Sequence, residues 1–288
     1  MSLESKLMAN EFVVLAEMDP PKGADVSLMV ENALRVKGRV DAFVVPEMGN
    51  AVMRMSALGA SLILQNKGMQ TVMQVCCRDR NRLALQADLL AAAACGIESV
   101  MAVQGEAPSY GDHHQARSVY DLDLMELFDA IKTLQSGKDM AGVELVGTPR
   151  FLMGATVNSG VSGSELDQTL EDMQRKINAG ARFFILPPVF DMNAIDTFLA
   201  GARDLQTCII PTVLLLKSLG MARYIARHMP QAHLPDSLIK RIQGAPDKVQ
   251  ECLKIASEAI TRTKEEGFCG VMLSSMGWED KIPDVLGR

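Results

Sequence analysis

Short runs of consecutive apolar residues recur along the chain, separated by longer segments in which apolar residues recur every three to four positions. The first pattern is typical of buried parallel strands, and the second of helices that pack one face against a sheet. The apolar runs predict strands at 12–16, 42–46, 71–77, 99–103, 151–157, 183–186, 208–216 and 270–275. The other segments predict helices at 2–10, 26–37, 51–66, 81–95, 121–135, 165–179, 192–204, 218–229 and 246–266, with a short helix beginning near Pro235.

This alternation predicts an α/β fold, a TIM (β/α)8 barrel that forms a single domain over residues 1–288. Eight helix-linked strands in 288 residues match the usual size of such a barrel. A doubly wound open sheet is the competing architecture. It usually carries a glycine-rich fingerprint after its first strand, whereas this chain has Glu17-Met-Asp-Pro-Pro there.

The composition limits which kinds of partner this protein can have. The formal net charge is −6, so we expect no nucleic-acid binding through an excess of basic residues. The chain contains no run of eighteen apolar residues, so we expect no membrane span. Its first residues lack the pattern of a secretory signal. The six cysteines show no CxxC spacing, which favours reduced thiols in a cytoplasmic protein. With only four histidines, two of them adjacent, we expect no metal site.

The end of the first predicted strand carries two carboxylates, Glu17 and Asp19. Pro20 removes a backbone donor and restricts the residue before it, so strand pairing must end there. Side chains at the carboxyl ends of barrel strands face the mouth where such folds place their chemistry. A solvated acidic turn explains this stretch alone equally well.

Other strand ends would meet Glu17 at the same mouth. Glu106 follows the fourth strand, and Thr156 ends the fifth. Several carboxylates at one mouth can raise one another's pKa and so supply a general acid. The charged segment 78–82 fits a capped, ion-paired start of a helix better than direct catalysis, and anion binding is a third possibility.

Five motifs occur in one order along the chain: Glu17-Met-Asp-Pro-Pro, Cys77-Arg-Asp-Arg-Asn-Arg, Gln104-Gly-Glu-Ala-Pro, Arg175-Lys-Ile-Asn-Ala-Gly-Ala and Gly277-Trp-Glu. Together they resemble the methylenetetrahydrofolate reductase family, particularly its short single-domain bacterial forms. The resemblance implies a flavin-containing TIM barrel. In such a protein FAD accepts hydride from NAD(P)H, or electrons from a partner protein, and reduces 5,10-methylenetetrahydrofolate to 5-methyltetrahydrofolate.

The resemblance also implies roles for individual residues. Glu17 matches the family's general acid, and Glu106 matches the carboxylate that lies near flavin and folate. Lys176 matches a lysine that contacts the flavin. The expected flavin contacts are Gln74, Gln104, Gly105, Tyr120, Asp121, Thr156 and Lys176, and the expected substrate contacts are Pro187 and Lys240.

Three positions depart from the family pattern. Pro187 stands where a glutamine commonly binds the pterin, Gln74 replaces a histidine, and Gln104 replaces an arginine. Two alternatives therefore stay open: a flavin-free folate-binding protein of methyl transfer, with a corrinoid partner, or a partner-dependent subunit of a redox complex. We also expect a homo-oligomer; the Met-rich segment 48–55 could form an interface or a core-facing helix.

Overall fold

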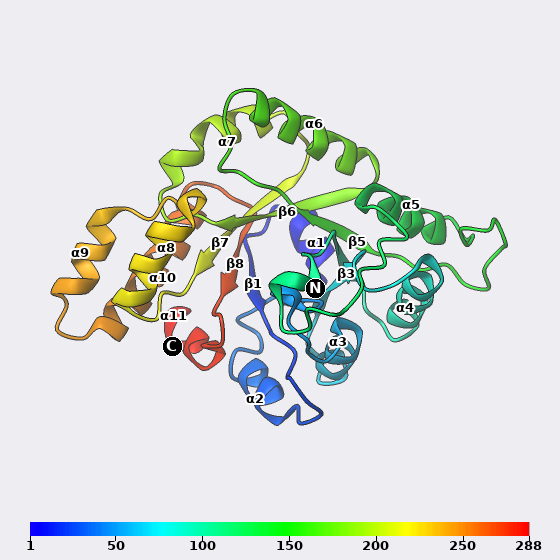
Figure 1. The fold of residues 1–288 in the computed structure, drawn as a ribbon, viewed down its shortest axis with the longest axis horizontal. Helices are drawn as coiled ribbons and strands as arrows, with labels where there is room; N and C mark the ends of the chain where they lie inside the picture. The colour runs from blue at the N-terminus through cyan, green and yellow to red at the C-terminus, as the bar shows by residue number, and fades with distance from the viewer. Residues whose placement is uncertain (288) are drawn as a thin grey trace.

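A computed structural model describes residues 1–287, and its strands form a closed barrel in the order in which they occur in the chain (Figure 1). All eight neighbouring pairs are parallel, and β1 closes the ring by pairing with β8. The predicted TIM barrel is therefore confirmed. The strands are β1 (Val13–Glu17), β2 (Ala42–Val45), β3 (Thr71–Cys76), β4 (Ser99–Val103), β5 (Leu152–Thr156), β6 (Ala181–Pro188), β7 (Cys208–Leu214) and β8 (Gly270–Ser274).

The main helices surround the barrel, and several begin at a side-chain cap that the sequence supplies (Figure 1). Asn81 caps one helix, and Asp123 and Glu126 form a reciprocal capping box at the next. The α-helices are α1 (Leu3–Met8), α2 (Ser27–Arg35), α3 (Ala57–Gln65), α4 (Arg82–Ala94), α5 (Leu124–Gln135), α6 (Ser164–Asn178), α7 (Asp196–Ala202), α8 (Leu219–His228), α9 (Asp236–Gly244), α10 (Lys248–Glu265) and α11 (Ile282–Val285). Short 3-10 turns are η1 (Gly49–Ala51), η2 (Pro108–Tyr110), η3 (Met192–Ile195), η4 (Pro230–Ala232) and η5 (Glu279–Lys281).

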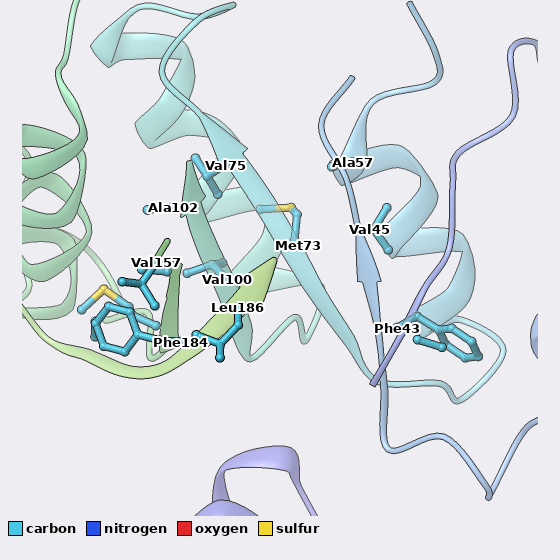
Figure 2. Packing of buried hydrophobic residues seen from close by; sticks show 14 of the residues in the cluster. Phe43, Val45, Ala57, Met73, Val75, Val100, Ala102, Val157, Phe184 and Leu186 are labelled. Atoms are coloured by element: carbon cyan, nitrogen blue, oxygen red, sulfur yellow. The ribbon is translucent and has the colours of Figure 1, made fainter. Parts of the chain in front are cut away.

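Apolar side chains fill both faces of the sheet. Outward-facing residues such as Phe43, Met73 and Phe184 pack against the helices (Figure 2), while Leu15 and Phe183 belong to a separate cluster inside the barrel. Helix α1 closes the amino end of the barrel: its buried leucines join that inner cluster, and its first backbone N–H donates to the side chain of Gln70, directly before β3. The opposite, carboxyl end of the strands is left for the site.

The predicted helix over 51–66 is wrong in its first turn. Residues 49–51 form a 3-10 turn, and α3 begins only at Ala57. Asn50 and Ala51 both have positive φ, 53° and 56°, a conformation that a right-handed helix cannot contain. Ser56 and the carboxylate of Glu47 then bind the first free N–H groups of α3. Within residues 1–287, no helix is both long and apolar enough to cross a membrane.

Candidate functional site

A cavity of about 590 Å³ opens at the carboxyl ends of the strands. All eight strands contribute to its wall, and β6 supplies the most residues. Apolar and polar side chains both line it, in nearly equal number. The lining residues are Glu17, Val44, Gln74, Met101, Thr156, Val157, Asn158, Ile185, Leu186, Pro187, Pro188, Thr212, Gln231, Met272 and Ser274.

Glu17 is the last residue of β1, and its carboxyl group lines this cavity. Burial raises its pKa to about 7, and the nearby carboxylates of Asp19 and Glu279 add to the increase. A hydrogen bond from Ser274 and the charge of Arg54 oppose it. A carboxyl group with this pKa is protonated in about half of the molecules at neutral pH, so it can act as an acid there.

Arg54 does not form an ion pair with Glu17 but lies closer to Asp19. Its guanidinium lies 3.6 Å from the Asp19 carboxylate and donates to the carbonyl oxygen of Pro20 over 3.0 Å. Glu279 in turn accepts hydrogen bonds from Ser275 and from the backbone of Gly277. The charged groups around Glu17 thus have other partners, and together with burial they leave its pKa raised.

Arginines and carboxylates pair at the ends of β2 and β3. Glu47 is buried, binds Arg80 over 3.1 Å and accepts from the backbone N–H of Ala57. Arg80 also pairs with Asp88 over 2.8 Å. The side chain of Arg78 is only 3% exposed and forms an ion pair with Asp79. This charged segment therefore has the structural role that its sequence favoured.

The segment after β4 is shaped by Gly105. Its φ is +83°, and a Cβ there would lie 2.4 Å from the sulfur of Cys76, so another side chain would be both strained and crowded. Tyr120 donates its hydroxyl to the carbonyl oxygen of Gly105 over 3.0 Å. Gln104 and Glu106 on either side are exposed, and neither lines the main cavity.

Lys176 and Asp121 lie at two different edges of the mouth. Lys176 is buried on α6 and pairs with Asp172 over 2.5 Å. It lines a second cavity of about 400 Å³, which shares Thr156, Val157 and Asn158 with the main one. Asp121 instead pairs with Arg82 at the start of α4, where it helps to hold the helix terminus.

Comparison with known families matches residues 2–287 to the model of methylenetetrahydrofolate reductase. The chain belongs to the methylenetetrahydrofolate reductase family. This membership confirms the resemblance carried by the five motifs, and it supports a folate-related function of the type that the family name describes.

One solved structure has a similar fold. It is an uncharacterised protein from Clostridium thermocellum that binds two copies of 5-methyl-5,6,7,8-tetrahydrofolic acid. The TM-score is 0.65 at 15% sequence identity, with 97% of this chain and 95% of that chain covered. At this identity the likeness shows a shared fold. A comparison with curated protein sequences found no match.

The flavin that the reductase family implies can be tested against the residues at the mouth. The main cavity has a partly apolar wall, which suits a flat ring system, and Gln74 and Thr156 offer polar groups along it. The neighbouring second cavity is lined mostly by polar and charged side chains, Lys176 among them. These features fit the ring portion of a flavin. The arginines that follow β3 are less suited to bind the phosphates of a flavin, because Arg78 and Arg82 are both paired with carboxylates.

The vicinal thiols of Cys76 and Cys77 are buried at the end of β3. Burial raises the pKa of Cys76 to about 11 and that of Cys77 to about 12. Both therefore stay protonated at neutral pH and are poor nucleophiles. Their burial and raised pKa values are those of packed thiols rather than of reactive ones.

Other lining residues were not expected from the sequence. Ser274 ends β8, and Gln231 lies in the 3-10 turn η4, after α8. Its position at the end of a strand could have identified Ser274. No such signal marks Gln231, which reaches the mouth from the segment between two helices. Pro187 lines the cavity as expected. Lys240 is exposed on α9 and does not line the cavity.

Proposed function

We propose that this protein catalyses the flavin-dependent reduction of 5,10-methylenetetrahydrofolate to 5-methyltetrahydrofolate, with Glu17 as the general acid. The observation that carries the proposal is a carboxyl group with a pKa of about 7 in the wall of the mouth cavity. An ordinary glutamate is ionised at neutral pH and cannot donate a proton efficiently. Family membership supplies the class of reaction.

Glu17 holds the proton that the folate needs. Protonation of N10 opens the five-membered ring of methylenetetrahydrofolate and leaves an electrophilic iminium carbon at N5. The hydrogen bond between Ser274 and Glu17 orients the carboxyl group as its proton leaves. Apolar residues of the wall such as Ile185 and Met272 give no hydrogen bond to a water molecule that could attack the iminium.

The flavin, when bound, supplies the hydride for the iminium carbon. Three side chains would hold it: Gln74 in the main cavity, Thr156 on the wall that the two cavities share, and Lys176 in the second cavity. We propose FAD as the flavin, with its reductant NADH, NADPH or a partner protein. Glu106, just outside the cavity, would act on the flavin through its charge rather than through a direct contact.

The test is the visible absorption spectrum of the purified protein before and after incubation with FAD and desalting. The proposal predicts a retained flavin spectrum that bleaches with a reductant and recovers on addition of methylenetetrahydrofolate without oxygen. Each candidate reductant can be added separately in the same cuvette. Absence of retained flavin, or a reduced flavin that folate does not reoxidise, would contradict the proposal.

A second candidate is a flavin-free, folate-binding protein that takes part in methyl transfer. What favours it is the similar barrel from Clostridium thermocellum, which binds 5-methyltetrahydrofolic acid. The pairing of Arg78 and Arg82 with carboxylates also leaves these two arginines unavailable to flavin phosphates. This candidate predicts binding of 5-methyltetrahydrofolate without flavin. A partner-dependent redox subunit would bind flavin but accept electrons only when its partner is added.

A further inference from the structure

On one side of the cavity, the strands carry almost no polar side-chain group that is free to bind a ligand. The wall there consists of Ile185, Leu186, Pro187 and Pro188 from β6, with Thr212 from β7. The hydroxyl group of Thr212 donates to the carbonyl oxygen of Leu186 over 2.6 Å. The β6–β7 side is therefore apolar except for what other segments bring to it.

Gln231 is the residue that brings a polar group to this side. It lines the same cavity from η4. The residue is exposed, and no hydrogen bond joins its amide to another side chain or backbone group within residues 1–287. The amide can thus give one donor and one acceptor to a ligand at the same time. Gln74 and Asn158 line other parts of the cavity, so on the β6–β7 side an apolar wall meets one amide, an arrangement typical of a site that orients a heterocycle.

Contacts with two neighbouring loops fix the backbone of Gln231. The next residue, Ala232, accepts from the backbone N–H of Phe190 over 2.9 Å, which ties η4 to the loop after β6. On the loop after β5, a Cβ at Gly160 would lie 3.2 Å from the Gln231 Cβ, so the two segments are in close contact. Gln231 is therefore held at the cavity instead of projecting from a free turn.

We propose that Gln231 determines specificity for the pterin ring of the folate, by pairing its amide with the amide-like edge of that ring. This inference rests on the proposed function. Glu17, on β1, acts at the folate nitrogens, and Gln231 approaches from the other side of the cavity, beyond β8 and β7. A reduced pterin presents adjacent donors and acceptors on the ring edge farthest from N10, and one glutamine side chain complements such an edge.

The test is calorimetric binding of 5-methyltetrahydrofolate and of 5-methyltetrahydropteroate, which lacks the glutamate. Gln231→Ala should weaken both by about tenfold, the usual size of a lost pair of hydrogen bonds. Gln231→Glu should weaken them at least as much, because a carboxylate cannot donate. Gln206→Ala is the matched control: Gln206 is exposed just before β7, at the opposite end of the barrel, and its loss should leave both affinities unchanged.

A rescue variant adds a readout that a merely structural role would not produce. Pro187→Gln places an amide on the same wall, and in the Gln231→Ala background it should recover part of the lost affinity. Unchanged affinity in Gln231→Ala, or a loss seen only with the glutamate-bearing ligand, would overturn the inference while leaving the proposed reaction intact. A wild-type protein that binds neither ligand would instead contradict the proposed function, and the inference with it.

Discussion

Glu17 and Glu47 are carboxylates at the ends of neighbouring strands, β1 and β2, yet their surroundings give them different properties. Glu47 has a cation, Arg80, at 3.1 Å and a backbone N–H donor from Ala57. Glu17 lies beside two further carboxylates, while the nearest arginine pairs with Asp19. Burial raises the pKa of both groups, but the next largest influence differs: the charge of Asp19 raises the pKa of Glu17 further, whereas the charge of Arg80 lowers that of Glu47.

The comparison teaches that the neighbours of a buried acid, rather than its residue type or strand position, decide its role. A buried carboxylate with a cation and a backbone donor has a structural role, because its removal leaves both partners without an acceptor. A buried carboxylic acid facing a cavity with like charges nearby keeps its proton and can deliver it. Four predictions test this distinction and the role of the nearby Glu106, in order from the largest expected effect to the smallest.

Replacing Glu17 with Gln should cause the largest change in activity. The rate of folate reduction should fall by about 10²–10⁴-fold, the range for loss of general acid catalysis. Reoxidation of the reduced flavin by an artificial acceptor needs no proton from Glu17 and should be unchanged. Both rates are measured by stopped-flow absorbance, and an equal loss of both would remove Glu17 from the acid role.

Replacing Glu47 with Ala should instead cause the largest change in stability. The substitution leaves Arg80 without one of its two carboxylates and removes the acceptor for the first turn of α3. We expect the free energy of unfolding to fall by about 3 kcal/mol, as measured by urea denaturation. Glu17→Gln is the matched comparison, since it should lose no stability at pH 7. A similar decrease in the free energy of unfolding in both variants would contradict the distinction between the two sites.

The stability contribution of Glu17 should depend on pH in a defined direction. Its pKa is raised in the folded state, so folding favours the protonated form. That contribution is fully present below the unfolded-state pKa of about 4.5 and is lost as pH rises through about 7. Relative to Glu17→Gln, the wild type should therefore lose up to about 2 kcal/mol between pH 5 and pH 8. A difference between the two proteins that is constant over this range would contradict the assignment.

Glu106 should have the smallest of these effects, because it is exposed and outside the cavity. Glu106→Ala removes a negative charge near the mouth, which should raise the flavin reduction potential by about 10–20 mV. Spectroelectrochemical titration of the bound flavin measures this. Glu98→Ala, at the amino end of β4, is a charge-matched control. An unchanged potential would place Glu106 too far from the flavin to influence it.

The sequence could predict the barrel and the position of Glu17 because both follow from local patterns. Eight apolar runs between helical segments specify parallel strands, and Pro20 specifies where β1 ends. The start of α3 could not be predicted from the spacing of apolar residues, because that spacing gives no sign of the positive φ at Asn50 and Ala51. Gln231 was missed for a related reason: only the packing of η4 against two other loops brings it to the cavity.

The most direct test of the acid role is the pH dependence of flavin reoxidation by methylenetetrahydrofolate, measured in the wild type and in Glu17→Gln. The account predicts a wild-type rate that is constant at low pH and falls about tenfold per pH unit above about 7. The variant should show a low rate without this decrease. A wild-type rate that does not change between pH 6 and pH 9, or the same decrease in Glu17→Gln, would contradict the central claim that Glu17 delivers the proton.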